Sequence, residues 1–243
     1  MRIDGNGDDD CISDLPNDIL SYILSLLSMR EAVKTRILSR RWRFLCSSSS
    51  NLHFDLLSVV GLDYTEQFRN PWVLYAKKIK FNNFFAEIFS THKSKFLTGV
   101  TQFLHFYNNL NINTFQVTFI LKNDCASHID QWINFALGMN ATTISLQLKC
   151  PLDCIYCYQD CSDYYNFPIH LLPPGETSPL KHLHLKYCTL TPSPAHSLRF
   201  NSLKTLEISY VVLSKFHLHT ILSGCLNLES LLLKECNMLH FDF

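Results

Sequence analysis

The chain has 243 residues, of which 47% are apolar, and its 21 basic side chains match its 21 acidic ones in number. This length accommodates one solenoid-like domain plus a small module, and the low charged fraction of 17% favours a protein that binds partners. A net charge of zero excludes an overall electrostatic field that would attract nucleic acid or anionic lipid, so we expect neither nucleic acid nor a membrane as a partner.

The N-terminal segment is polar. Its first ten residues read MRIDGNGDDD and contain no apolar stretch of a secretory signal, so residues 1–11 are expected to form a disordered leader. No run in the sequence approaches the roughly 18 apolar residues that a membrane-spanning helix needs. We therefore expect an intracellular protein, located in the cytoplasm, the nucleus or both. In that reducing environment the ten cysteines are predicted to be small buried hydrophobic residues.

Three short helices are predicted between residues 12 and 50. Pro16 suits the first turn of the first helix, Ser28 and Glu31 have the spacing of a capping box for the second, and Ser39 can cap the third. Their apolar faces need a cover, because about forty residues seldom fold alone. That cover is either the rest of this chain or another protein. In the first helix, apolar residues recur at three- and four-residue steps: Ile19, Leu20, Ile23, Leu24 and Leu27.

This segment resembles an F-box. The match consists of ISDLP at residues 12–16, the Ile-Leu pairs at 19–20 and 23–24, and LSRRW at residues 38–42. The resemblance implies binding to a Skp-type adaptor, which links F-box proteins to a cullin scaffold in an E3 ubiquitin ligase. Carried over position by position, it predicts the following residues in or beside the adaptor interface: Leu15, Pro16, Ile19, Leu20, Ile23, Leu24, Val33, Leu38 and Trp42.

Residues 51–110 are predicted to connect the helices to the rest of the chain. Residues 52–54 alternate as a short strand, and the polar, unpatterned stretch 63–70 marks a domain boundary. A helix follows, and its aromatic stripe is interpreted as core that seals the start of the next region. The stripe consists of residues that share one helical face: Phe81, Phe84, Phe85, Ile88 and Phe89.

Residues 111–243 contain about five copies of a Leu-x-x-Leu-x-Leu ladder. The segments between ladders predict helices, notably at 128–137 and 218–222. Because no single repeat can bury its own apolar side, each copy is expected to complete its core against its neighbours. Three copies are clear: Leu180, Leu183, Leu185; Leu203, Leu206, Ile208; and Leu228, Leu231, Leu233. Two are weaker: Ile112, Phe115, Val117; and Ala141, Ile144, Leu146.

The repeat region is similar to the irregular leucine-rich repeats of plant F-box proteins, by the sequences at residues 129–137, 203–206 and 223–231. The predicted fold class is therefore mixed α/β, with a three-helix F-box module followed by an irregular leucine-rich-repeat solenoid. Many relatives continue into a further C-terminal domain, whereas this sequence stops at Phe243. We accordingly expect the last repeat to be uncapped.

An insertion from Cys150 to Cys161 contains four cysteines, with His170 beyond it, and four thiolates can ligate zinc. The cysteines are separated by three, two and three residues, without the paired two-residue knuckles that identify zinc ribbons. We therefore predict a disordered or loosely packed loop, and neither a metal nor another cofactor.

The motifs of common enzyme classes are missing from the sequence, which has no nucleophile elbow, phosphate-binding glycine loop or His-Glu-x-x-His helix. The leading hypothesis is a non-catalytic substrate-recognition subunit of a Skp-cullin-F-box ligase, whose repeats bind an unknown protein. The alternative is a truncated protein that binds the adaptor without delivering a substrate. A zinc-stabilised nucleic-acid binder is disfavoured by the neutral charge. The predicted substrate-binding residues are solvent-facing strand positions: His182, His184, Lys204, Glu207 and Lys234.

Overall fold

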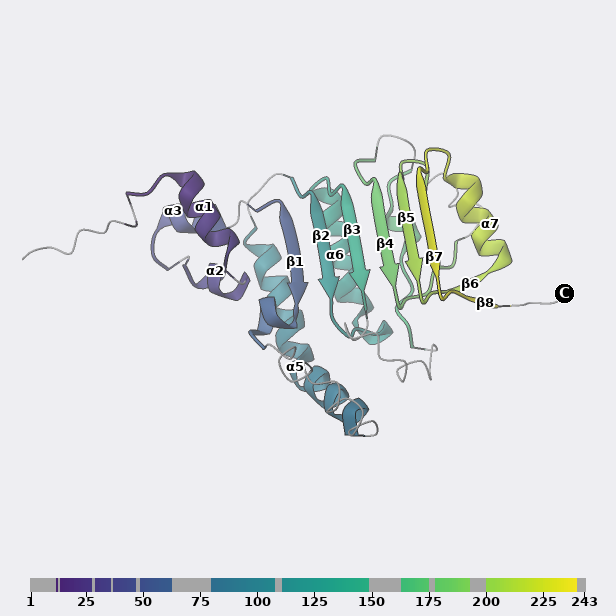
Figure 1. Cartoon of the computed structure of the whole chain (residues 1–243), viewed down its shortest axis with the longest axis horizontal. Helices are drawn as coiled ribbons and strands as arrows, with labels where there is room; N and C mark the ends of the chain where they lie inside the picture. Colours follow the sequence, from purple (N-terminus) through teal and green to yellow (C-terminus); the bar gives the residue numbers. More distant parts are fainter. Residues whose placement is uncertain are drawn as a thin grey trace, which may run out of the picture.

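The structure is a row of parallel strands with three small helices at one end and α7 at the other (Figure 1). None of the described helices is both long enough and apolar enough to cross a membrane. The computed structural model describes the following residues: 12, 14–27, 29–35, 37–46, 49–62, 80–107, 111–148, 163–174, 178–192 and 200–239.

The three predicted N-terminal helices are confirmed as α1 (Asn17–Ser25), α2 (Met29–Thr35) and α3 (Arg40–Cys46). Pro16 occupies the N-cap of α1, and the Ser39 hydroxyl accepts a hydrogen bond from the Trp42 amide at 3.3 Å, as the cap of α3 requires. The proposed cap at Ser28 lies outside the described residues. A small core joins these helices: Leu20, Leu24, Ala32, Trp42 and Leu45.

One six-stranded parallel sheet contains the strands in the order β1-β2-β3-β4-β5-β7. A second parallel pair, β6 (Val212–Ser214) with β8 (Asn237–Leu239), lies beside its far end. The members of the large sheet are five residues long: β1 (Asn51–Asp55), β2 (Thr114–Thr118), β3 (Thr143–Gln147), β4 (His182–Lys186), β5 (Thr205–Ser209) and β7 (Ser230–Lys234).

The strand register confirms the predicted ladders, because their second and third residues pair across neighbouring strands. One row of the sheet consists of Phe115, Ile144, Leu183, Leu206 and Leu231. The next consists of Val117, Leu146, Leu185, Ile208 and Leu233. β1, which was predicted as a strand outside the ladders, adds Leu52 and Phe54 to these rows. The sheet therefore begins directly after the three helices.

Helices lie on one face of the sheet (Figure 1). Their buried apolar residues share one core with the ladder side chains. The helices predicted at 128–137 and 218–222 are confirmed as α6 (Ala126–Gly138) and α7 (Lys215–Gly224), and the aromatic stripe lies in α5 (Lys80–His105). The side chains of that stripe are outside the described part of the structure. Further along α5, Phe96 stacks on Phe119 with ring centroids 4.0 Å apart and meets the edge of Trp132. Short turns complete the array: η1 (Leu56–Val60), η3 (Asn123–Cys125) and η5 (Ile169–Leu171).

The described cysteines occupy apolar surroundings. Cys125 and Cys188 are buried, as predicted, whereas Cys225 and Cys236 are partly buried. Burial raises the pKa of the Cys188 thiol to about 12, which keeps it protonated. The cysteine-rich insertion at 150–161 and the predicted boundary at 63–70 fall outside the described residues. Within the described ranges, no three His, Cys, Asp or Glu side chains gather as metal ligands would.

Candidate binding surfaces

The outer side of the three-helix module carries an apolar stripe. Ile19, Tyr22 and Leu26 follow one another at steps of three and four residues, so they share one side of α1 and its C-cap. Tyr22 is 64% exposed and Leu26 is 68% exposed. Ile37 and Leu38, between α2 and α3, are also exposed. Exposed apolar residues that follow one another along a helix are typical of surfaces that bind another molecule. We call these five residues the module surface.

The predicted adaptor-binding residues fall into three groups in the structure. Pro16, Ile19 and Leu38 are exposed to solvent. Leu15, Ile23 and Val33 are partly buried and pack against the small core. The remaining three are buried: Leu20, Leu24 and Trp42.

The prediction that Leu20 and Leu24 lie in the adaptor interface stays a prediction, and in this structure both side chains belong to the core of the module. Leu20 is fully buried in the folded module, and Leu24 is nearly so. They lie on the side of α1 that packs against α3, about 100° around the helix from their exposed neighbours. The spacing predicted one apolar stripe on α1, whereas its apolar residues form one buried stripe and one exposed stripe. The exposure of Tyr22 and Leu26 was not predicted, although their spacing from Ile19 indicates it. Ile37 lies outside the helices, so no helical period indicates its exposure.

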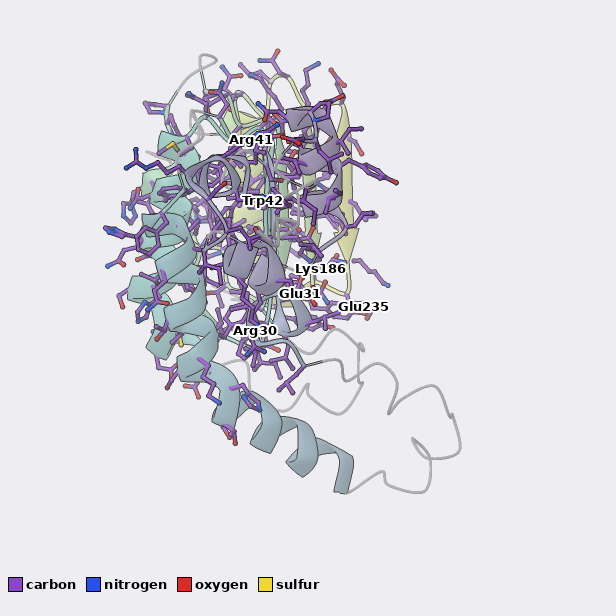
Figure 2. All side chains as sticks on the ribbon, turned by 90° about the vertical axis from the view of Figure 1, so that its left-hand side faces the viewer. Arg30, Glu31, Arg41, Trp42, Lys186 and Glu235 are labelled. Carbon is purple, nitrogen blue, oxygen red and sulfur yellow. The ribbon has the colours of Figure 1, made fainter. Side chains whose placement is uncertain are left out.

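Arg41 fixes the start of α1. Its guanidinium donates from Nε to the Asn17 side-chain oxygen at 2.7 Å and from Nη2 to the carbonyl of Leu15. Figure 2 views the molecule from this end and shows Arg41 and Trp42 in the module, above Arg30. Because α3 holds the segment that leads into α1, the module surface is presented by a preformed structure rather than by a loose helix.

Arg30 joins the module to the sheet. Its Nη1 donates a hydrogen bond at 2.9 Å to the carbonyl of Val60, the last residue of η1. Two cavities, of about 380 and 330 Å³, flank the Arg30 side chain where α2 meets η1 and α5. The junction is thus formed by a few specific contacts and is not densely packed.

The second surface is the open face of the sheet, which we define by the first, third and fifth residues of the six long strands. These residues alternate with the buried ladder positions, so they point away from the helices. The middle row across this face is mainly polar: His53, Gln116, Ser145, His184, Glu207 and Leu232.

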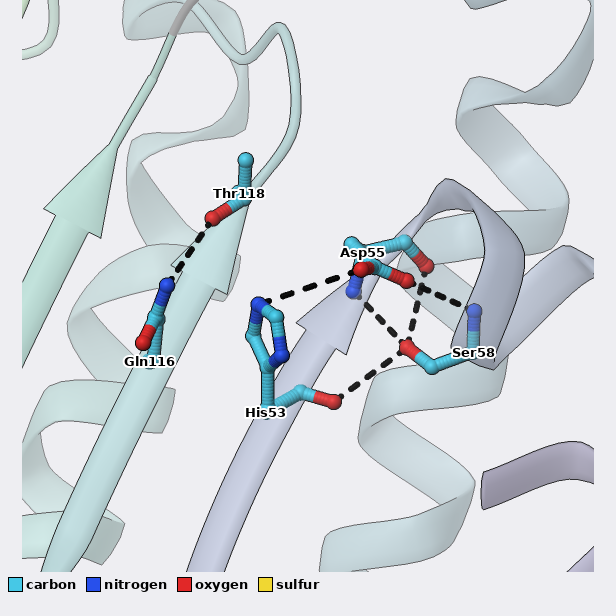
Figure 3. Close-up of polar contacts among 5 residues, drawn as sticks. All are labelled: His53, Asp55, Ser58, Gln116 and Thr118. Carbon is cyan, nitrogen blue, oxygen red and sulfur yellow. Dashed lines mark hydrogen bonds and ion pairs between the residues drawn. The ribbon is translucent and has the colours of Figure 1, made fainter. Parts of the chain in front are cut away.

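The β1 end of the open face is organised by side-chain hydrogen bonds (Figure 3). The Asp55 carboxylate accepts from the Ser58 amide at 2.6 Å, and the Ser58 hydroxyl accepts from the Asp55 amide at 2.9 Å, which caps η1. His53 Nε2 lies 3.8 Å from the same carboxylate. On the adjacent strand β2, the Gln116 side-chain amide donates a hydrogen bond to the Thr118 hydroxyl. These contacts hold the polar groups of β1 and β2 in fixed positions.

Charged groups gather further along the open face. His184 Nδ1 lies 2.8 Å from one oxygen of Glu207, and Lys186 Nζ lies 3.6 Å from the other. Burial raises the pKa of Glu207, but the hydrogen bond from His184 and the charge of Lys186 outweigh it and hold that pKa below its ordinary value. Glu207 therefore remains ionised at neutral pH.

Four of the five predicted substrate-binding residues lie on the open face, and the fifth lies just outside it. His182, His184, Glu207 and Lys234 lie on the open face. Lys204 precedes β5, is exposed, and forms an ion pair with Glu229 at 2.7 Å. Lys186 and Ser209 also lie on the open face and were not predicted, although each continues the same two-residue alternation within its strand.

Comparisons with known proteins agree with this architecture. Residues 12–54 match the F-box domain family, and residues 104–241 match the family described as "At1g61320/AtMIF1, LRR domain". The chain belongs to the plant F-box/LRR-repeat family. No solved structure gives a significant match.

Arabidopsis thaliana contains similar F-box/LRR-repeat proteins. F-box/LRR-repeat protein At3g03360 is 30% identical over 241 residues, a match that covers 95% of this chain and 39% of that relative. F-box/LRR-repeat protein 25 is 27% identical over 233 residues, covering 96% of this chain and 70% of the relative. The chain spans about two fifths of the length of several relatives that it matches.

Proposed function

We propose that this chain is the substrate-recognition part of a Skp-cullin-F-box E3 ubiquitin ligase. In this proposal the module surface binds a Skp-type adaptor, which connects the chain to a cullin, and the open face binds a protein substrate. The chain supplies binding and positioning inside the cell, and other subunits carry out ubiquitin transfer. The observation that carries the proposal is the exposed apolar stripe on a module that has its own core and matches the F-box family.

The energetics of the module surface support adaptor binding. Burying a large apolar side chain contributes roughly 1.5–3 kcal/mol, and a few such anchors dominate the affinity of a typical interface. Ile19, Tyr22 and Leu26 offer several anchors without unfolding the module, because their exposure does not depend on opening its core. A small module can therefore form a firm complex.

The repeat array supports the second half of the proposal. A continuous core from β1 to β5 holds the open face as one rigid surface. A substrate held on that surface meets the ubiquitin-carrying subunits at a high effective concentration, which accelerates transfer without catalytic groups on this chain.

Co-purification with a co-expressed Skp-type adaptor tests the proposal. We expect Ile19→Asp combined with Tyr22→Asp to abolish co-purification and leave the melting temperature of the chain nearly unchanged, because both residues are exposed. Phe216→Asp on α7 is the matched control, since it also places a charge at an exposed apolar position but lies at the other end of the array. Undiminished co-purification of the Ile19/Tyr22 variant would contradict the proposed interface.

A further inference from the structure

Three residues on the open face form one row across adjacent strands. Lys186 of β4 pairs in register with Ser209 of β5, and Ser209 pairs with Lys234 of β7. Neighbouring strands lie about 4.8 Å apart, so the two lysines stand on either side of the serine. We call this set the Lys-Ser-Lys row.

The serine at the centre of the row has an unused hydrogen-bonding group. Ser209 is only 1% exposed, and its Oγ has no hydrogen-bond partner among the described residues. Its equivalents on β2, β3 and β4 are partly exposed, so the burial of Ser209 is specific to this strand. A buried hydroxyl without a partner is unfavourable and is uncommon in folded proteins. The flanking side chains are long and flexible lysines, which can move to admit a ligand.

The two lysines of the row differ in whether a carboxylate neutralises their charge. Lys186 shares the Glu207 carboxylate with His184, whereas no described carboxylate forms an ion pair with Lys234. Lys234 instead lies over the Tyr210 ring, with its ammonium 5.9 Å from the ring centroid. Tyr210 stacks in parallel on Tyr187, with centroids 4.6 Å apart, so the residues after β4 and β5 form a rigid aromatic border.

We propose that the Lys-Ser-Lys row binds an anionic side chain, a carboxylate or a phosphate, on an extended segment of the protein substrate. This inference rests on the proposed function and specifies the chemistry of its substrate. Two ammonium groups complement the charge of the anion, and the Ser209 hydroxyl supplies a donor between them. Glu207 in the neighbouring row would repel the continuous negative charge of a nucleic acid, which favours a single anionic group on a peptide.

Binding of degenerate peptide pools to the full chain in complex with its adaptor tests this inference. The pools differ only in one fixed central residue, which is phosphoserine, glutamate, serine or lysine. We expect the phosphoserine and glutamate pools to be retained about tenfold better than the serine and lysine pools. The ratio of the first two pools identifies whether phosphate or carboxylate is preferred.

Substitutions assign the preference to the row. Lys186→Gln with Lys234→Gln is expected to equalise the pools, whereas Lys204→Gln, which removes an exposed lysine just outside the face, is expected to leave the preference intact. Ser209→Ala should reduce retention of the anionic pools without lowering the melting temperature, because it removes a hydroxyl that no described residue uses. A purely structural role for Ser209 would lower the melting temperature instead.

The inference is overturned if all four pools are retained equally or if no pool is retained. It is also overturned if the preference for the anionic pools persists in the Lys186→Gln/Lys234→Gln variant. Adaptor co-purification is measured in the same samples. Loss of adaptor co-purification would contradict the proposed function. If the adaptor still co-purifies but the four peptide pools are retained equally, only the proposed role of the Lys-Ser-Lys row is overturned.

Discussion

At the scale of single residues, Gly61 and Arg30 set how the three-helix module meets the sheet. Gly61 follows η1 with a φ of +82°, in the left-handed region that favours glycine. The Arg30 side chain lies over it, and a Cβ atom added at Gly61 would lie 2.5 Å from Arg30 Nη1. The glycine therefore makes room for the arginine that donates to the carbonyl of Val60.

Gly61→Ala is expected to destabilise the chain by about 1–2 kcal/mol, from backbone strain alone, and to displace Arg30 from the junction. Gly138→Ala is the matched control, because the residue is helical and no described atom beyond its own chain neighbours and helix backbone lies within 4 Å of the added Cβ. Urea denaturation gives the change in unfolding free energy, and limited proteolysis reports whether the module has loosened. Equal behaviour of the two variants would show that the junction does not depend on Gly61.

At the scale of elements, the strands share one ladder but differ in how well it is covered. Leu206 of β5 is fully buried between β4 and β7, whereas its register partner Leu231 of β7 is 39% exposed. A ladder residue is buried from two sides in the middle of the array and from one side on its last strand. A leucine at the same ladder position therefore contributes more to the free energy of unfolding in β5 than in β7.

Leu206→Ala is expected to lower the free energy of unfolding by about 2–5 kcal/mol, because it leaves a cavity in a closed core. Leu231→Ala should cost less than half as much, since part of that side chain already contacts water. Chemical denaturation of both variants under the same conditions measures the difference. Similar losses at the two positions would indicate that β7 is covered as completely as β5 in solution.

At the scale of the whole molecule, the described residues form two separate cores. Among the described residues, the core of the three helices contains five buried side chains, and the core of the array extends from Leu52 to Ile221. Described contacts between them are concentrated where α2 meets η1, around Arg30. A small core gives little cooperative stability, so the module should open more readily than the array.

Hydrogen exchange followed by mass spectrometry is expected to show faster exchange in α1 and α3 than in β3 and β4, where every second side chain is buried. Addition of a Skp-type adaptor should slow exchange in α1 and leave β3 unchanged, because only the module gains a partner. Protection of β3 on adaptor addition, without a change in α1, would contradict the proposed division between the two parts.

The sequence by itself determined the six long strands of the array and its helices α6 and α7, but not the short pair β6 and β8. Ladder residues such as Leu183 and Leu185 recur at a strand period, and Ile129, Trp132 and Ile133 recur at a helix period, so local patterning was enough to place β4 and α6. It also led to the family, because F-box and repeat motifs are short and contiguous. These features depend on residues that are near one another in the chain.

Only the tertiary structure decided which side chains are available for binding. Leu20 and Ile19 are adjacent and equally apolar, and only packing against α3 separates the core residue from the surface residue. The meeting of His184 with Glu207, and of Arg30 with Val60, joins residues 23 and 30 positions apart. No local period encodes such contacts, because they arise when strand register and helix docking bring separate segments together.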